Sequence, residues 1–166
     1  GCVLRESGSI LKGNNEALLL QFSGGECGSH MWRMNGDGTT FRSYGVDADN
    51  CDETCRAALK AEISPAQTAF HRNLQLKHVE RDYLFVHAGL RPGCALEGQS
   101  AEDLIWIRQP FLDSSQDWGY TVVHGHTTVA ESDIRENRID IDTGAVWMGQ
   151  LTAMAFHGAC REVIQT

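Results

Sequence analysis

Four short runs along this chain, either apolar or alternating between polar and apolar residues, each stop at a polar turn that contains glycine. Such runs are long enough for strands and too short for helices. The runs and the turns that end them are Ile10–Lys12 before Gly13-Asn14-Asn15-Glu16, Tyr83–Val86 before His87-Ala-Gly89, Thr121–Val123 before His124-Gly-His126, and Arg138–Ile141 before Asp142-Thr-Gly144. Sheet proteins place ligands where strands end, because rigid backbone delivers side chains to a shared crevice. The pattern therefore predicts a site built from these turns.

Elsewhere the pattern becomes helical in three places. Glu16–Phe22 has helical spacing, and another helix is expected to begin near Asp52, after a polar stretch. Ser64 followed by Pro65 is typical of the cap and first turn of a helix, which we expect to reach about Asn73.

Strand-like and helical segments together predict a mixed α/β fold. A further strand is expected at Leu151–Phe156. Few helical residues separate the last three runs, which favours a sheet with substantial antiparallel pairing, because parallel strands need a longer crossover. The chain has 166 residues, so residues 1–166 are expected to form a single domain.

The charge balance narrows the classes of partner. The chain has 14 Lys and Arg against 22 Asp and Glu, a net charge of −8. An acidic chain argues against binding nucleic acid or an anionic membrane, because phosphate contacts need clusters of Lys and Arg. No apolar run approaches the roughly 18 residues of a membrane span. The first residues also lack the basic start and apolar core of a signal peptide.

The six cysteines form no C-x-x-C pair and are too sparse for a small disulfide-stapled scaffold. Cys51 and Cys55 lie close together, in or beside a loop. We expect mainly free thiols and a cytoplasmic protein, with a disulfide or a cysteine metal site as the alternatives.

Asn14, His87 and His126 are the main candidates for a metal site, since each lies in one of the turns with a glycine close to it. A neutral imidazole nitrogen binds divalent transition metals, and glycine lets the backbone turn tightly. Taken singly, each histidine is more often a hydrogen-bonded scaffold residue than a ligand. His124, just before His126, could be a second ligand, a substrate contact or a packed structural residue.

Arg108 lies among apolar residues in Leu104-Ile-Trp-Ile-Arg108. A guanidinium held there could grip two phosphate oxygens, or it could reach the surface and pair with a carboxylate. Asp142 could ligate a metal, although a turn role is favoured. Gly36-Asp37-Gly38 is a turn without P-loop character, and the chain contains neither G-x-x-x-x-G-K-[ST] nor G-x-S-x-G.

Taken together, the turns resemble the later motifs of the phosphoprotein phosphatases, in the calcineurin-like metallophosphoesterase superfamily. These motifs are Gly13-Asn14-Asn15-Glu16, Phe85-Val-His87-Ala-Gly89, His124-Gly-His126-Thr and Ile141-Asp-Thr-Gly-Ala145. Small bacterial serine/threonine phosphatases also have stretches similar to Trp32…Asn35-Gly-Asp-Gly, Ser43-Tyr-Gly45, Asp103-Leu-Ile-Trp-Ile-Arg108-Gln-Pro-Phe111 and Gly149-Gln-Leu-Thr152. The resemblance covers nearly the whole chain and implies a β-sandwich flanked by helices.

The resemblance implies a two-metal phosphoesterase that hydrolyses phosphoserine and phosphothreonine through a metal-activated water. Asn14, His87 and His126 match three ligands of one metal, for which Mn²⁺ is expected and iron or zinc are alternatives. Arg108 matches an arginine that grips the phosphate. Dinucleoside polyphosphate hydrolases share these motifs and are an alternative interpretation.

Two features depart from the family pattern. Its first motifs, GDxHG and GDxxDRG, supply the other metal ligands and occur nowhere in the chain, so an N-terminally truncated fold is expected. Asn15 stands where the family has the histidine thought to protonate the leaving group, and an amide cannot act as a general acid near neutral pH. We therefore expect weak metal binding and impaired activity. A catalytically dead pseudophosphatase or fragment is the alternative.

The partners expected are a phosphorylated protein or a small phosphoester as substrate, with no nucleic acid and no membrane. A sandwich that lacks its first strands would expose an apolar edge, so self-association through that edge is also expected. A bare structural or interaction module is the remaining alternative, and it would bind no divalent metal.

Overall fold

The computed structural model describes residues 8–26, 38–46, 53–157 and 160–166. The chain divides into two compact units, one of residues 1–13 with 75–166 and one of residues 14–74. Buried apolar side chains occur in both units. The single domain predicted for residues 1–166 stays a prediction, since one domain can contain two such units.

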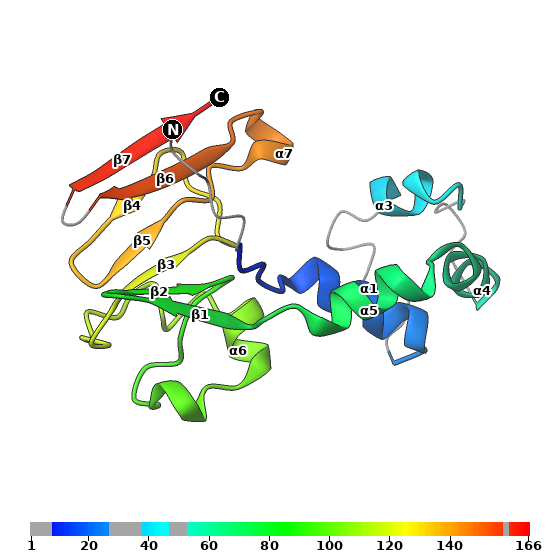
Figure 1. The fold of residues 1–166 in the computed structure, drawn as a ribbon, viewed down its shortest axis with the longest axis horizontal. Coiled ribbons are helices and arrows are strands. Elements are labelled where there is room, and N and C mark those ends of the chain that lie inside the picture. Colours follow the sequence, from blue (N-terminus) through cyan, green and yellow to red (C-terminus); the bar gives the residue numbers. More distant parts are fainter. Residues whose placement is uncertain (1–7, 27–37, 47–52, 158–159) are drawn as a thin grey trace, which may run out of the picture. The chain divides into compact units, whose positions relative to one another are not determined.

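The larger unit is built on a five-stranded sheet of order β1-β2-β3-β5-β4 (Figure 1). Its strands are β1 (Lys77–Glu80), β2 (Tyr83–Val86), β3 (Thr121–His124), β4 (Asp133–Ile134) and β5 (Arg138–Asp140). The central strands β2, β3 and β5 run parallel, and β1 and β4 pair antiparallel at the two edges. The carboxyl ends of the three central strands therefore meet at one edge of the sheet.

One face of this sheet packs on helix α6 (Ala101–Trp106) and the segment that follows it. Alternate residues of β2 point toward this face, as the pleat of a strand requires. The core on this face consists of Leu84, Val86, Ala88, Leu90, Leu104, Ile107, Phe111 and Val122. A short 3-10 helix, η1 (Leu96–Gly98), precedes α6.

The opposite face of β2 carries Tyr83 and Phe85. Their ring centroids lie 4.3 and 5.9 Å from that of Phe156. Phe156 belongs to β6 (Thr152–His157), which pairs antiparallel with β7 (Cys160–Gln165). A two-stranded sheet thus covers the face that α6 does not, and helix α7 (Ala145–Met148) leads into it.

The smaller unit consists of helices in its described part. They are α1 (Asn14–Gly24), α3 (Gly38–Ser43), α4 (Glu53–Glu62) and α5 (Pro65–Asn73). Helix α1 lies against α4 and α5, and the rings of Phe22 and Phe41 pack edge to face at 5.5 Å. Ser64 caps α5: its hydroxyl accepts from the Gln67 backbone N–H at 3.1 Å, while the Gln67 side chain accepts from the Ser64 N–H at 2.9 Å.

Most of the predicted elements are confirmed. The helices at Glu53–Glu62 and Pro65–Asn73 and the strands β2, β3, β5 and β6 lie where the sequence predicts them. The segment Ile10–Lys12 is less regular, since it forms a single bridge between Leu11 and Gln75. The helix expected at Glu16–Phe22 begins earlier, at Asn14.

The predicted antiparallel pairing occurs between β1 and β2, between β4 and β5 and between β6 and β7, but not between β3 and β5. These strands are parallel, with His124 opposite Asp140. The segment between β3 and β5 is long enough to cross over without a helix. It contains β4, which pairs antiparallel with β5.

Among the described residues, no helix is both long and apolar enough to cross a membrane. Cys94 and Cys160 are free thiols, whereas Cys55 is disulfide-bonded, so the expectation of free thiols is wrong for Cys55. Cys51, the turn at Gly36-Asp37 and the start of the polar stretch near Asp52 lie outside the described residues.

Candidate functional site

Three polar side chains gather at the edge where the central parallel strands end. His87 directly follows β2, His126 lies just beyond β3, and Asp142 lies just beyond β5. The backbone ladder continues into these turns, because the Gly125 N–H donates to the His87 carbonyl at 2.9 Å. The predicted convergence of the turns after β2, β3 and β5 therefore occurs in the structure.

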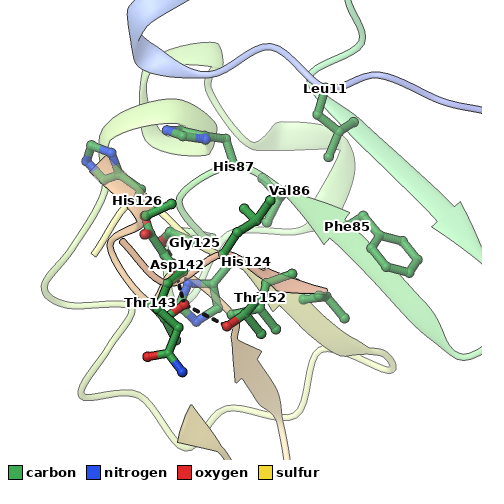
Figure 2. Close-up of a pocket in the computed structure, with 15 residues that line it drawn as sticks. Leu11, Phe85, Val86, His87, His124, Gly125, His126, Asp142, Thr143 and Thr152 are labelled. Carbon is green, nitrogen blue, oxygen red and sulfur yellow. Dashed lines mark hydrogen bonds between the residues drawn. The ribbon is translucent and has the colours of Figure 1, made fainter. Parts of the chain in front are cut away.

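His87 and His126 lie next to each other, with ring centroids 5.1 Å apart. Both line a cavity of about 350 Å³, and Figure 2 shows them together on one side of it, away from Leu11 and Phe85. Nε2 of His126 is buried and has no hydrogen-bond partner among the described residues. A buried imidazole nitrogen without a partner, beside a second imidazole, fits the donor set of a divalent transition metal.

The backbone and neighbours of His126 fix its ring. Its φ is 68°, a left-handed conformation that costs a residue with a side chain about 1–2 kcal/mol. The Trp106 ring packs against it edge to face at 5.7 Å. Burial, and then the positive charge of Arg108, lower the pKa of His126 to about 4. The imidazole is therefore neutral near pH 7, the form that binds metals.

Arg108 is exposed and lies beside His126. Its Nη1 donates to the His126 carbonyl and to the Thr127 hydroxyl, each at 3.1 Å. Both bonds use Nη1, so Nε and Nη2 have no hydrogen-bond partner in the part of the chain that the structure describes. This placement agrees with the predicted phosphate contact, which stays a prediction.

His124 is wholly buried beneath this edge, with 0% of its side chain exposed. Its Nδ1 lies 3.2 Å from the Gly125 carbonyl oxygen, and its ring meets that of Phe111 edge to face at 5.0 Å. Burial lowers the pKa of His124 to about 4. Of the three roles that the sequence left open, this environment favours the packed structural residue.

Asp140 is a buried polar residue that sequence reasoning missed. Its Oδ2 lies 3.7 Å from Nδ1 of His124, and its Oδ1 accepts from the Asp142 N–H at 3.0 Å. Burial raises the pKa of Asp140 to about 7. Polar and apolar residues alternate in Arg138–Ile141, yet both Arg138 and Asp140 are buried, because β5 is an inner strand.

Asn14 and Asn15 belong to the smaller unit. Asn14 is the first residue of α1 and is buried, whereas Asn15 is exposed. Asn15 lines a cavity of about 250 Å³ together with Tyr44 and His71. The metal role of Asn14 and the consequence of Asn15 therefore stay predictions.

The described residues contain no group of three or more His, Cys, Asp or Glu side chains that could hold a metal ion. His87 and His126 supply two imidazoles, and Asp142 lines the same cavity with its Oδ1 accepting from the Gly144 N–H at 3.0 Å. Three protein ligands are usual at a catalytic zinc site. The weak metal binding expected from the sequence stays a prediction.

The comparisons with known proteins bear on the fold. No family model matches the chain, and no curated protein matches it. One similar solved structure is of a protein named a "putative diadenosine tetraphosphatase", with a TM-score of 0.61 and 18% sequence identity. The likeness covers 95% of this chain and 68% of that one. The chain therefore shares a mixed α/β fold with that structure, consistent with the calcineurin-like fold that the sequence predicted.

Proposed function

We propose that this protein is a metal-dependent phosphoesterase that hydrolyses phosphoserine and phosphothreonine monoesters. The observation that carries the proposal is the pair of imidazoles of His87 and His126, 5.1 Å apart at the ends of adjacent parallel strands. The buried, unpartnered Nε2 of His126 supports metal binding, and the fold shared with the structure named a "putative diadenosine tetraphosphatase" supports the reaction class.

A divalent metal, when bound, polarises the phosphate and makes a water nucleophilic at neutral pH. His87 and His126 would hold the ion through neutral ring nitrogens. Arg108 would donate from Nε and Nη2 to the phosphate oxygens, which orients the ester and offsets negative charge in the transition state. The neutral state of His126 near pH 7 follows from its lowered pKa.

Asn15 stands where the family resemblance places the general-acid histidine, and on that resemblance a slow reaction is expected with alcohol esters. The alkoxide of serine or threonine is a poor leaving group and needs a proton, which an amide cannot supply. A positioned general acid typically contributes about 10²–10⁴-fold. Impaired activity is therefore part of the proposal, and a pseudophosphatase is its limiting case.

Hydrolysis of dinucleoside polyphosphates is the second candidate. The similar structure is of a protein named for diadenosine tetraphosphate. The leaving group of a phosphoanhydride is itself a phosphate, which departs as an anion without being protonated. A site with Asn15 would therefore lose less rate with this substrate than with a phosphoserine peptide.

The test compares the chain with Asn15→His on both substrates. Phosphate release from a phosphoserine peptide and cleavage of diadenosine tetraphosphate are measured with Mn²⁺ and with excess chelator. We expect Mn²⁺-dependent release that Asn15→His raises at least about tenfold for the phosphopeptide and changes little for the anhydride. Exposed His157→Ala is the matched control and should change neither rate.

Each outcome decides between the candidates. A rise confined to the phosphopeptide supports the phosphatase, whereas anhydride cleavage by both proteins without peptide hydrolysis supports the second candidate. No Mn²⁺-dependent hydrolysis of either substrate by either protein would overturn the phosphoesterase proposal.

A further inference from the structure

We propose that Asp140 positions the metal-binding side chains of the candidate site, acting through His124 and through the turn at Asp142. Its consequence for metal binding rests on the proposed function, whereas the contacts that carry it are present without metal. Asp140 touches neither substrate nor metal in this account, so it is a positioning residue.

The first contact fixes the turn that ends β5. Oδ1 of Asp140 accepts from the Asp142 N–H at 3.0 Å, and Oδ1 of Asp142 accepts from the Gly144 N–H at 3.0 Å. A carboxylate that binds the backbone N–H two residues on is a strong local turn constraint. Gly144 has a φ of 70°, and a Cβ there would lie 2.6 Å from the Thr128 side chain. The turn that carries Asp142 into the cavity is thus held from both ends.

The second contact, between Asp140 and His124, leads to the backbone beside the two imidazoles. His124 and Asp140 are opposite each other in the β3–β5 register, with Nδ1 and Oδ2 3.7 Å apart. Nδ1 also lies 3.2 Å from the carbonyl oxygen of Gly125, the residue that precedes His126. The N–H of Gly125 donates to the His87 carbonyl at 2.9 Å. Fixing the His124 ring therefore fixes the Gly125 peptide, which bonds to the His87 backbone and precedes His126.

The cost of burying Asp140 supports a positioning role. A buried carboxyl is expensive unless it is hydrogen-bonded, and an apolar residue of similar size avoids that cost. The neighbouring buried charge, Arg138, bonds instead to the Asp133 carboxylate and to the Leu112 carbonyl, each at 3.0 Å. The polar groups that Asp140 meets directly are the Asp142 N–H and the His124 ring.

The test starts without metal. In excess chelator, the imidazole ¹H–¹⁵N signals of His87 and His126 are recorded for wild type, Asp140→Asn and Asp140→Ala. We expect Asp140→Ala to shift or split both signals. We expect Asp140→Asn to stay close to wild type, because an amide oxygen can still accept from the Asp142 N–H. The control is Val122→Ala, which weakens β3 on the face toward α6 and should leave the signals in place.

The same proteins are then titrated with Co²⁺. Loss of a residue that orients metal ligands typically costs about 10–100-fold in metal affinity. We expect a loss of that size for Asp140→Ala, a smaller one for Asp140→Asn and none for Val122→Ala. If Asp140→Ala does not fold, His124→Phe is used in its place. This variant keeps an aromatic ring beside Phe111 and removes both imidazole nitrogens.

Unchanged imidazole signals in Asp140→Ala, or equal changes in Val122→Ala, would overturn the positioning role. If the signals respond to Asp140→Ala but wild type binds no Co²⁺, the positioning role stands and the proposed metal-dependent function fails. The two failures are therefore distinguishable.

Discussion

The ring of Phe111 fills the space that a side chain on Gly89 would need. A Cβ on Gly89 would lie 2.2 Å from Cδ1 of Phe111, well inside any van der Waals contact. The same ring supports His124 edge to face at 5.0 Å. The glycine that ends the His87 turn is therefore required by packing beneath the candidate site.

Replacing Gly89 with alanine should destabilise the protein. The new methyl group would force the Phe111 ring away from the core, and overpacking of this kind typically costs about 1–3 kcal/mol. Urea unfolding of Gly89→Ala measures the loss. Gly8→Ala is the control, because a Cβ there meets nothing within 4 Å. Equal stability of the two variants would show that Phe111 can move aside without cost.

The turns that carry His87 and His126 could be predicted from the sequence, because short apolar runs and glycines mark strand ends locally. The strand order could not, since it depends on the path of the segment between β3 and β5. Asp140 was missed for the same reason. Whether a polar residue in an alternating run faces solvent depends on its neighbouring strands, and β5 has a strand on each side.

Asp140→Asn should change how stability depends on pH. Burial raises the pKa of Asp140 to about 7, whereas an unfolded Asp has a pKa near 3.9. Between these values the folded protein keeps a proton that the unfolded chain has lost, so the contribution of Asp140 to stability falls as pH rises from about 4 to about 7. Asp140→Asn lacks this pH-dependent contribution to stability, because an amide does not titrate.

The free energy of unfolding of Asp140→Asn, minus that of wild type, should therefore increase with pH across this range. Urea unfolding of both proteins in chelator, at several pH values from about 4.5 to about 7, measures the difference. His124 and His126 titrate in both proteins, which is why the comparison is made as a difference. A constant or falling difference would contradict the raised pKa of Asp140.

Arg108→Ala should weaken phosphate binding. Hydrogen bonds to a charged group contribute about 1.5–3 kcal/mol, so we expect the affinity of the Mn²⁺-loaded protein for inorganic phosphate to fall about tenfold to a hundredfold. Calorimetric titration with phosphate measures it. Arg91→Ala is the control, because Arg91 is exposed and pairs with Asp103. Equal phosphate affinity in both variants would exclude Arg108 from the phosphate site.

The most direct test of the account is the affinity of the chain for Mn²⁺, measured by calorimetry before any substrate is added. His87→Ala and His126→Ala remove the two imidazoles, and His157→Ala removes an exposed histidine on β6. We predict weak binding by wild type and by His157→Ala, and loss of at least about tenfold in each of the other two variants. If His87→Ala and His126→Ala each bind Mn²⁺ with the affinity of wild type, the claim that these histidines form the metal site is contradicted.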